Sequence, residues 1–485
     1  MITTDRMAAV DANAAALGVP RKQLMESSGN AVAREVRALA DPGASVELLC
    51  GRGNNGGDAF VAARFLSAYD VTVRLLGRPE SIRTEISREN WDALDAAEIP
   101  AETVTDAADL ALDDPDVVVD AMLGSGIAGA LREPERTAAR LANESDAAVV
   151  AVDVPSGIDA DTGEPTGNAS SNAGSAVHVE ADRVVTFHDE KPGLAALDAD
   201  VTVADIGIPA AAERFTGPGD LFGIARDPNS HKGENGEVLV IGGGPYTGAP
   251  WLSARSALRT GADLVHVACP ETVAGTVQGY SADLIVRALP GDRIGPAHVD
   301  RALELAAGND VVVVGPGLGD GEGASEFVRE FLSRYDGRAV VDADALRVVP
   351  EVDTDAELIC TPHQGELVGM GGETADDPDE RADLVRSFAD EIGHTLLVKG
   401  AVDAVSDGDA VRLNRTGNPG MTVGGTGDVL AGAVGALAAV TDPFHAAAAG
   451  VYANGLAGDA AAEELGYGLA ATDLPDRLPE AMRDE

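Results

Sequence analysis

Two successive series of short apolar runs alternate with longer polar stretches, and this alternation limits the folds that the chain can adopt. Short runs rich in valine and leucine, bounded by glycine or proline, are typical of buried strands. Strands that alternate with helix-compatible stretches predict parallel sheets covered by helices on both faces. The first series has runs at residues 46–50, 71–77, 117–123, 148–154 and 182–188, and the second at 236–244, 264–270, 311–319, 339–346, 358–366 and 395–400.

The alternation pauses at the turn-rich stretch 215–219, FTGPG, before the second series begins. We therefore expect two α/β domains, with a boundary between roughly residues 215 and 230. The length of 485 residues is compatible with this division. Residues 1–40 have apolar side chains at helical spacing and predict a helical lead-in to the first sheet.

The composition is strongly acidic, because 81 aspartates and glutamates face 35 lysines and arginines and give a net charge of −46. The hydrophobic content of 45% is nevertheless that of a folded protein. A field of this sign disfavours nucleic acid and anionic membranes as partners, and its self-repulsion has to be screened by counterions. We therefore expect a halophilic protein from a potassium-rich cytoplasm, with small molecules as its partners.

The apolar run 429–440 is too short to span a bilayer, and residues 1–15 lack the basic and apolar regions of a signal peptide. We therefore expect a soluble, cytoplasmic protein. The sequence leaves the oligomeric state open, a homo-oligomer included. Each of three widely separated cysteines ends a strand-like run, so we expect buried apolar residues and no disulfides or metal ligands. They are Cys50, Cys269 and Cys360.

Only four lysines occur in the chain, at Lys22, Lys191, Lys232 and Lys399. Lysine is ordinarily among the commonest residues, so one that persists in such a composition is a stronger functional candidate. Three of them lie next to glycine or proline, in EKPG, SHKG and VKG. Lys22 follows Pro20 in a polar stretch, and we expect it at the surface.

Residues 417–428, GNPGMTVGGTGD, place five glycines and one acid before a predicted helix over 429–440. Free backbone N–H groups and the positive end of the helix dipole together favour phosphate binding. A carboxylate beside phosphate is unfavourable unless it transfers a proton, so Asp428 is a candidate base for a phosphoryl acceptor. The alternative is that Asp428 only caps the helix, because aspartate is a favoured N-cap residue.

The loop 51–58, GRGNNGGD, follows a predicted strand and precedes a predicted helix, as a phosphate-binding loop does. Asparagine and glycine are also ordinary turn residues, so a simple turn is the alternative. Asp120, Asp153 and Ser156 lie at the ends of two further runs, where parallel sheets bind their ligands. Oxygen donors without histidine or cysteine favour a hard monovalent or divalent cation over zinc.

Four motifs in this half, GNNGGD, VDAMLGSGI, VDVPSGIDADTG and TFHDEKPGL, resemble the epimerase domain of the bifunctional NAD(P)H-hydrate repair enzymes. The resemblance covers nearly all of residues 1–215 and implies a Rossmann-like parallel sheet. It implies potassium binding by Asn55, Asp120 and Ser156, with Asp153 as a substrate contact and acid/base. The family usually has glycine where this chain has Ala59. The implied hydrate-binding residues are Asn54, Asn55, Gly56, Gly57, Asp58, Gly124, Ser125, Gly126, Ile127, Ala128, Gly129, Ala130 and Asp153.

The predicted strands of the second half also end in polar or glycine-rich motifs. Lone histidines are more often structural than functional, but His363 lies in a loop directly after a strand. Lys399 ends another predicted strand, where its point charge suits a phosphate group. His231 and Lys232, before the first strand of this half, are further candidates. The motifs are GPGLG at 315–319, VDADAL at 341–346 and TPHQGE at 361–366.

These motifs, with SHKGENGEVLVIGGG, GAPWLSARSALRTGAD and GNPGMTVGGTGD, occur in the order seen in ribokinase-like NAD(P)H-hydrate dehydratases. The resemblance covers about residues 226–485 and implies a parallel sheet flanked by helices, an α/β/α architecture. The family usually has small or hydroxyl residues where this chain has Val402 and Asp403. The implied hydrate contacts are Ala249, Gly317, His363 and Asp428. The implied nucleotide contacts are Lys399, Gly400, Ala401, Val402, Asp403 and Gly427.

The predicted organisation is an epimerase domain at 1–215, a linker at 216–225 and a dehydratase domain at 226–485. We expect the first domain to interconvert the R and S hydrates of the reduced nicotinamide nucleotides. We expect the second to dehydrate the S hydrate with ADP as co-substrate, releasing AMP and phosphate. Potassium and Mg²⁺ are the expected ions. The sequence does not distinguish ADP from ATP, or NADH hydrate from NADPH hydrate.

Two alternatives remain at this point. A small-molecule kinase of the ribokinase-like class would share the glycine-rich motif and Asp428, but it gives no reason for the fused first domain. A binding or scaffold protein would need none of the polar residues at the strand ends. The presence of Asn55, Asp120, Asp153 and Ser156 argues against that reading.

Overall fold

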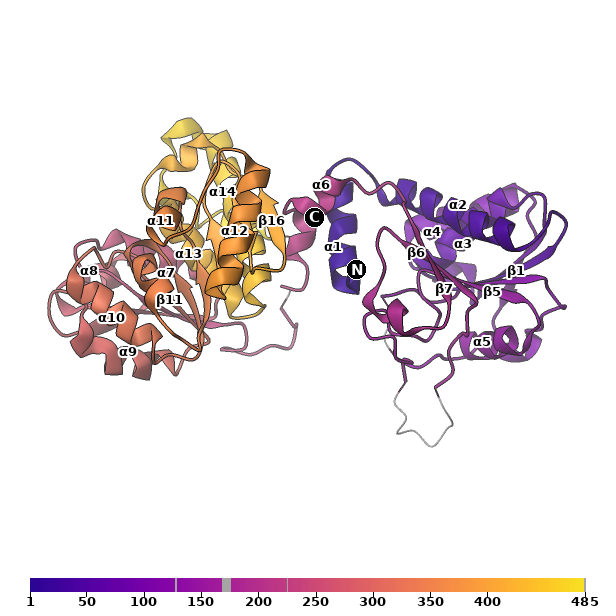
Figure 1. The fold of residues 1–485 in the computed structure, drawn as a ribbon, viewed down its shortest axis with the longest axis horizontal. Coiled ribbons are helices and arrows are strands. Elements are labelled where there is room, and N and C mark those ends of the chain that lie inside the picture. Colours follow the sequence, from indigo (N-terminus) through magenta and orange to yellow (C-terminus); the bar gives the residue numbers. More distant parts are fainter. Residues whose placement is uncertain (127–128, 168–175, 225, 484–485) are drawn as a thin grey trace. The chain divides into compact units, whose positions relative to one another are not determined.

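The computed structural model describes residues 1–126, 129–167, 176–224 and 226–483. The chain divides into two compact units, Met1–Ala212 and Glu213–Glu485. Figure 1 colours the first from indigo to magenta and the second from magenta through orange to yellow. Two predicted hydrate-binding residues, Ile127 and Ala128, lie outside the described residues.

The first unit contains a seven-stranded sheet in the order β3-β2-β1-β4-β5-β6-β7. All neighbouring strands are parallel. The order of the strands reverses between β1 and β4, which is where open parallel sheets bind their ligands. The strands are β1 Ser45–Cys50, β2 Asp70–Leu76, β3 Ala101–Val104, β4 Val117–Ala121, β5 Ala148–Val152, β6 Arg183–Phe187 and β7 Asp200–Ala204.

Helices cover both faces of this sheet. Successive residues of a strand point to opposite faces, so Val117 and Val119 join the core with α1, α2 and α3, while Val118 packs with α5. The sheet is therefore buried on both faces, as the apolar runs predict. The helices are α1 Thr4–Ala16, α2 Arg21–Leu39, α3 Asn54–Phe65, α4 Glu85–Ala96, α5 Glu135–Glu144 and α6 Ala210–Arg214.

The second unit contains a nine-stranded sheet in the order β10-β9-β8-β11-β12-β13-β14-β15-β16. The strands from β10 to β14 are parallel, whereas β15 is antiparallel to both β14 and β16. The prediction of a parallel sheet therefore fails at this edge. The strands are β8 Glu237–Ile241, β9 Leu264–Pro270, β10 Ile285–Leu289, β11 Val311–Val314, β12 Arg338–Val341, β13 Glu357–Cys360, β14 Thr395–Val398, β15 Asp403–Ser406 and β16 Val411–Asn414.

Two helical layers enclose this sheet. Val311 and Val313 pack with α7, α13 and α14, while Val312 and Val314 pack with α9, α10 and α12. The result is the expected α/β/α architecture. The helices are α7 Gly248–Thr260, α8 Glu271–Tyr280, α9 Val299–Ala306, α10 Glu322–Leu332, α11 Gln364–Gly369, α12 Pro378–Ile392, α13 Thr426–Ala438, α14 Pro443–Leu465 and α15 Leu478–Ala481.

Helix α13 is buried from Val429 to Ala438, and its small residues explain how it fits there. A Cβ atom on Gly432 would lie 2.0 Å from the carbonyl oxygen of Ser253 in α7, so only glycine allows this approach of the two helices. The helix carries the glycine-rich motif at its amino end. Close packing therefore holds that motif in place near the carboxyl ends of the strands.

All eleven predicted strand runs contain a strand, and the two-domain α/β prediction is confirmed. The missed strands lie at or next to sheet edges. Most residues of β3, β7 and β10 are exposed or half-buried, so no apolar run marks these strands. The part of the chain that the structure describes has no helix long and apolar enough to cross a membrane. The prediction of free, buried cysteines is also confirmed.

The segment predicted as a linker makes contacts in the second unit. Thr216 donates its backbone N–H to the carbonyl oxygen of Leu413 over 2.8 Å. Leu221 lies in the core beneath α7 and α13. The predicted domain boundaries at residues 215 and 225 remain predictions. The contacts within the chain place the boundary between the two compact units after Ala212.

Candidate active sites

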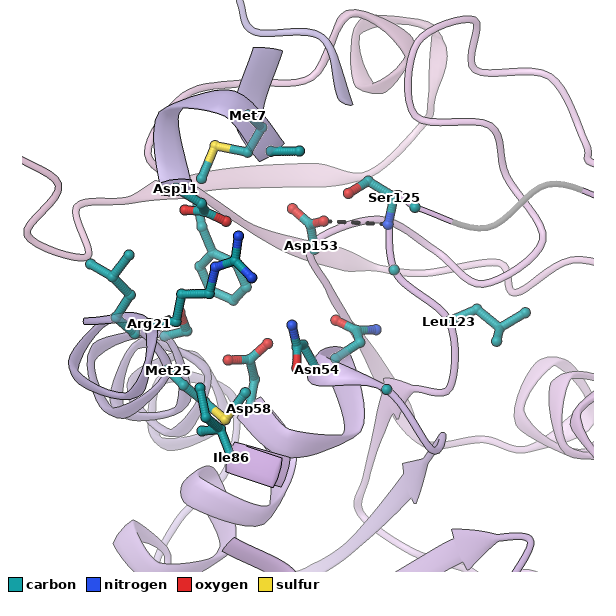
Figure 2. Close-up of a pocket in the computed structure, with 18 of the residues that line it drawn as sticks. Met7, Asp11, Arg21, Met25, Asn54, Asp58, Ile86, Leu123, Ser125 and Asp153 are labelled. Atoms are coloured by element: carbon teal, nitrogen blue, oxygen red, sulfur yellow. Dashed lines mark hydrogen bonds between the residues drawn. The ribbon is translucent and has the colours of Figure 1, made fainter. Parts of the chain in front are cut away.

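A cavity of about 430 Å³ lies where the strand order of the first sheet reverses. Helices α1 and α2 form one wall, and the start of α3 forms another. The carboxyl ends of β1, β4, β5 and β6 form a third wall, and the lining is completed by Arg83, Ile86, Glu135, Lys191 and Ile206. Figure 2 shows Asp11, Arg21, Asp58 and Asp153 pointing into this space from different elements. The cavity therefore gathers charged groups from segments that are far apart in the sequence.

The glycine-rich loop of the first unit leads directly into α3. The helix begins at Asn54 after the N-cap residue Gly53. A Cβ atom on Gly56 would lie 2.1 Å from the carbonyl oxygen of Gly51, so glycine is required for this tight return of the backbone. Asn54, Asn55 and Asp58 line the cavity. Thr84 donates its hydroxyl to Oδ1 of Asn54 over 2.7 Å.

Asp120 and Ser156 form a buried pair at the ends of β4 and β5. Ser156 donates its hydroxyl to Oδ1 of Asp120 over 2.6 Å and its backbone N–H to Oδ2 over 2.7 Å. Burial raises the pKa of Asp120 to about 6, although hydrogen bonds from Ser156 and Met122 oppose the rise. Asn55 is also buried, and its amide nitrogen has no hydrogen-bond partner among the described residues. These oxygen-rich side chains are compatible with a hard cation.

Asp153 follows β5 in the left-handed region, at φ +67°, which non-glycine residues seldom adopt. Its Oδ1 lies 3.2 Å from Nζ of Lys191. Its Oδ2 accepts a long hydrogen bond from the backbone N–H of Ser125, at 3.4 Å (Figure 2). The strained backbone thus directs this carboxylate into the cavity.

Two further acids line the same cavity. Burial raises the pKa of Asp58 well above its ordinary value, and the charges of Asp153 and Asp11 add to this effect. Burial also raises the pKa of Asp11 to about 6, against the charges of Arg21 and Lys191. The cavity therefore holds acids in different electrostatic settings, a pattern common at sites of proton transfer.

The predicted hydrate-binding loop after β4 is only partly in the cavity wall. Gly124, Ser125 and Gly126 line the cavity. Gly129 and Ala130 are exposed and lie outside its lining. A ligand that contacts the whole loop would therefore extend beyond the cavity.

In the second unit, Lys399 lies among acids from neighbouring strand ends. Its Nζ is 2.9 Å from Oδ1 of Asp342 and 3.8 Å from Oε2 of Glu366. A Cβ atom on Gly427 would lie 3.2 Å from the same Nζ. Burial acts to lower the pKa of Lys399, but the charges of Asp342 and Glu366 outweigh burial and raise it. The predicted nucleotide contacts Lys399 and Gly427 are thus adjacent.

Asp428 is the third residue of α13 and does not cap it. The N-cap is Gly425, at φ +103°, and no side chain caps the helix. The alternative interpretation of Asp428 as an N-cap is therefore wrong, because the glycine-rich turn continues to Gly425 before the helix starts. Burial raises the pKa of Asp428 to about 7, the charge of Asp342 adds to this, and that of Lys399 opposes it.

The other predicted hydrate contacts of this unit fall into two groups. Gly317 and Ala249 are neighbours, since a Cβ atom on Gly317 would lie 3.3 Å from Cβ of Ala249. His363 follows β13 and caps α11, its Nδ1 accepting backbone N–H groups of Gly365 and Glu366. The backbone of Lys399 donates to the carbonyl oxygen of Pro362. His363 therefore lies beside Lys399, and its Nδ1 is already engaged in capping α11.

The turn after Lys399 explains where Asp403 points. Asp403 accepts the backbone N–H of Gly400 over 2.8 Å and an amide N–H of Asn414 over 2.9 Å. Burial raises the pKa of Asp403 to about 6, against these hydrogen bonds. Its carboxyl group thus closes the turn between β14 and β15. Val402 is half-buried, and its carbonyl oxygen accepts from Arg381 over 2.7 Å.

Sequence reasoning missed several residues that the fold brings to the sites. Asp342 and Glu366 lie in motifs that it singled out, but their proximity to Lys399 requires the strand order. Asp11 and Arg21 belong to the helical lead-in, where no motif marks them. His231 and Lys232 precede β8 and are exposed, at the opposite end of the strands from the other candidates.

Comparisons with known proteins match both units. Residues 21–193 match the YjeF-related protein N-terminus, and residues 238–480 match NAD(P)H-hydrate dehydratase. A solved structure of an ADP/ATP-dependent NAD(P)H-hydrate dehydratase from Bacillus subtilis, co-crystallised with ATP and Mg²⁺, is 26% identical. It covers 53% of this chain and 92% of its own, with a TM-score of 0.47.

Relatives match this chain over nearly its whole length, as two of them show. A bifunctional NAD(P)H-hydrate repair enzyme from Methanothermobacter thermautotrophicus is 45% identical over 98% of this chain and 94% of its own length. One from Pyrobaculum aerophilum is 44% identical over 99% of this chain and 98% of its own. Because this similarity includes both units, the chain belongs to the family of bifunctional NAD(P)H-hydrate repair enzymes.

Proposed function

We propose that this protein repairs the hydrates of NADH and NADPH, with epimerisation in the first unit and ADP-dependent dehydration in the second. Water added at C6 of the reduced nicotinamide gives R and S hydrates that cannot donate hydride. The first unit interconverts these two forms. The second unit acts on the S form, so the two activities together recover both. Membership of the family and the two separate groups of polar residues support this division.

Dehydration needs a better leaving group than hydroxide, and a phosphoryl group supplies it. Asp428 takes the proton of the C6 hydroxyl, whose oxygen then attacks the β-phosphorus of ADP while the bond to AMP breaks. The phosphate at C6 then leaves with its bonding electron pair. Loss of a proton from C5 completes the double bond and restores the reduced nicotinamide.

The position of Asp428 is the observation that carries this proposal. The carboxyl group lies in the first turn of α13, and the neighbouring Gly427 approaches Lys399 closely. The backbone N–H groups at the start of α13 and the Lys399 ammonium provide positive charge for the transferring phosphoryl group. A pKa of about 7, raised mainly by burial, suits Asp428 to accept a proton near neutral pH.

Epimerisation is assigned to the cavity of the first unit, with Asp153 as the acid/base. Asp153 reaches the cavity together with Asn54, Asn55 and Asp58. The loop and helix start that carry the asparagines provide N–H groups for the phosphates of the hydrate. The remaining loop residues, from Gly124 onwards, extend this binding surface.

Potassium fits the donor set of Asn55, Asp120 and Ser156. These side chains offer amide, carboxylate and hydroxyl oxygens and no sulfur or imidazole. Asp120 is fully buried and, among the described residues, has no basic side chain paired with it. A bound cation would supply the missing charge and would hold the loops after β4 and β5 in place.

Mg²⁺ is expected to enter with the phosphates of ADP. The described residues contain no group of three or more histidine, cysteine, aspartate or glutamate side chains arranged to hold a metal ion. Mg²⁺ commonly keeps several waters and binds through one or two carboxylates plus substrate phosphates. Such an ion neutralises phosphate charge during transfer.

One assay separates this function from the alternatives. Mixed R and S hydrates are incubated with the protein, ADP, Mg²⁺ and K⁺, and the absorbance of the reduced nicotinamide is followed. Full recovery requires both activities, whereas recovery of only the S fraction indicates dehydration alone. A kinase that forms a stable phosphoester, or a binding protein, would restore no absorbance and would refute the proposal.

A further inference from the structure

Lys191 is a buried cation in the first unit, and its surroundings set its position closely. Its side chain has an exposed fraction of 0%. The ammonium donates to the carbonyl oxygen of Phe187 over 2.9 Å and to that of Asp189 over 3.3 Å. Its third near oxygen is Oδ1 of Asp153, at 3.2 Å. Three acceptors thus surround a group that has three N–H donors.

The backbone around Lys191 is itself tied to the rest of the unit. Lys191 is the N-cap of the short 3-10 helix Pro192–Ala196. The N–H of Gly193 donates to the carbonyl oxygen of Ala160 over 2.8 Å. Because the carbonyl acceptors lie within four residues along the chain, they hold the ammonium whether or not Asp153 is present. The ammonium of Lys191 therefore keeps its position and can orient the carboxylate of Asp153.

Two further contacts of Asp153 are longer. Thr186 donates its hydroxyl to Oδ1 over 3.3 Å, and Ser125 donates its N–H to Oδ2 over 3.4 Å. Two further acids of the cavity, Asp11 and Asp58, interact electrostatically with Asp153 and repel its charge. Arg21 faces Asp11 from α2. Lys191 is thus a cation in direct contact with Asp153.

We propose that Lys191 is the positioning residue for Asp153 in epimerisation, holding its carboxylate directed at the hydrate. This inference rests on the proposed epimerase function. Lys191 acts through Asp153 and does not exchange a proton with the substrate. Contact with a fixed ammonium sets the orientation of the adjacent carboxylate, and a fixed orientation brings that carboxylate close to the reacting carbon.

The experiment replaces Lys191 with methionine, which keeps the length of the side chain and removes its charge. K191M should lower kcat for epimerisation by about 100-fold or more and change KM by less than about threefold. K191R keeps the charge and should recover about a tenth or more of the wild-type kcat. A kcat in K191M that stays within about threefold of the wild type, or a loss of activity that lies mainly in KM, would overturn the inference.

A matched control and a double variant separate positioning from general damage. K22M removes the other described lysine of this unit, which is exposed and pairs with Glu89, and should leave epimerisation unchanged. D153N combined with K191M should be no slower than D153N alone, since both act through one carboxylate. Additive losses would contradict the role of Lys191 through Asp153.

A readout without turnover distinguishes this inference from the epimerase assignment. Crystal structures of the wild type and of K191M are compared at the Asp153 carboxylate. The carboxylate should leave its wild-type position in K191M, and an unmoved carboxylate would overturn the inference. Absence of epimerisation in the wild-type protein would instead contradict the proposed function, while the crystal structures would still decide the contact between Lys191 and Asp153.

Discussion

Lys399 and Asp342 lie 2.9 Å apart at the carboxyl ends of two strands that are separated by β13 in the second sheet. Asp342 is buried and also accepts the hydroxyl of Thr361 over 2.8 Å. Its negative charge attracts the ammonium of Lys399. The same charge also raises the pKa of Asp428, although burial contributes more to that rise. One acid therefore influences both the expected phosphate contact and the expected base.

Replacing Asp342 with asparagine should change the pH dependence of dehydration. The amide oxygen can still accept from Lys399 and Thr361, but the negative charge near Asp428 is lost. The pKa of Asp428 should fall, so the acidic limb of kcat/KM should move to lower pH by about one unit. Initial rates of hydrate dehydration between pH 5 and 9 test this.

Asp344 provides the matched control for that variant. It belongs to the same motif, two residues on, and pairs with Arg347 at 3.4 Å. D344N should leave the pH profile where the wild type has it. A shift of equal size in D344N would show that the effect of D342N does not depend on contact with Lys399.

The wild-type dehydratase should itself lose activity as the pH falls below neutrality. Asp428 acts as a carboxylate, and burial raises its pKa to about 7. Below that pH the protonated form dominates, and kcat/KM should fall by about tenfold per pH unit. A flat profile from pH 5 to pH 8 would contradict the assignment of Asp428 as base.

The first unit should lose stability as the pH rises, which is the opposite of ordinary acid denaturation. Burial raises the pKa of Asp120 from 3.8 to about 6, so the fold favours the protonated acid. Its stabilising contribution is fully present below pH 3.8 and is lost as the pH rises through 6. A shift of about two units corresponds to about 3 kcal/mol for this fully buried group. Asp11, raised mainly by burial to a pKa of about 6, acts in the same direction.

Potassium should reverse part of this loss by binding the ionised carboxylate. In urea unfolding of the first unit, K⁺ should stabilise the fold at pH 8 more than at pH 4, while tetramethylammonium at the same ionic strength should not. D120N should remove the difference between the two cations. Equal stabilisation of wild type and D120N by K⁺ would contradict a site at Asp120.

The fold should also loosen when salt is removed. The net charge of −46 repels itself, and counterions reduce this repulsion within a distance that shrinks as ionic strength rises. The melting temperature should therefore increase from millimolar to molar KCl. An unchanged melting temperature over that range would contradict the halophilic interpretation of the composition.

The strands with long apolar runs could be predicted from sequence, and the strands at or next to the sheet edges could not. The valine run of β11 is buried on both faces and is recognisable as such. In contrast, β7 has the pattern of an exposed edge strand, and β15 and β16 are four-residue strands beside a turn. Such strands form because a neighbouring strand offers unpaired backbone groups, and that information is not local.

The same distinction applies to the sites. Asp153 and Asp428 stand out because glycine-rich or strand-end motifs surround them. Asp11 does not, because it reaches the cavity only through the packing of α1 against the sheet. The contact between Lys191 and Asp153 could not be predicted from the sequence either, because it depends on the fold. The scarcity of lysine nevertheless marks Lys191 as a candidate functional residue.

The most direct test of the account replaces Asp428 with asparagine. The S hydrate is incubated with ADP and Mg²⁺, and recovery of the reduced-nicotinamide absorbance is measured beside ADP binding and the melting temperature. D428N should fold and bind ADP but lose dehydration, because no carboxylate remains to take the hydroxyl proton. Retention of most of the wild-type rate in D428N would contradict phosphoryl transfer with Asp428 as its base.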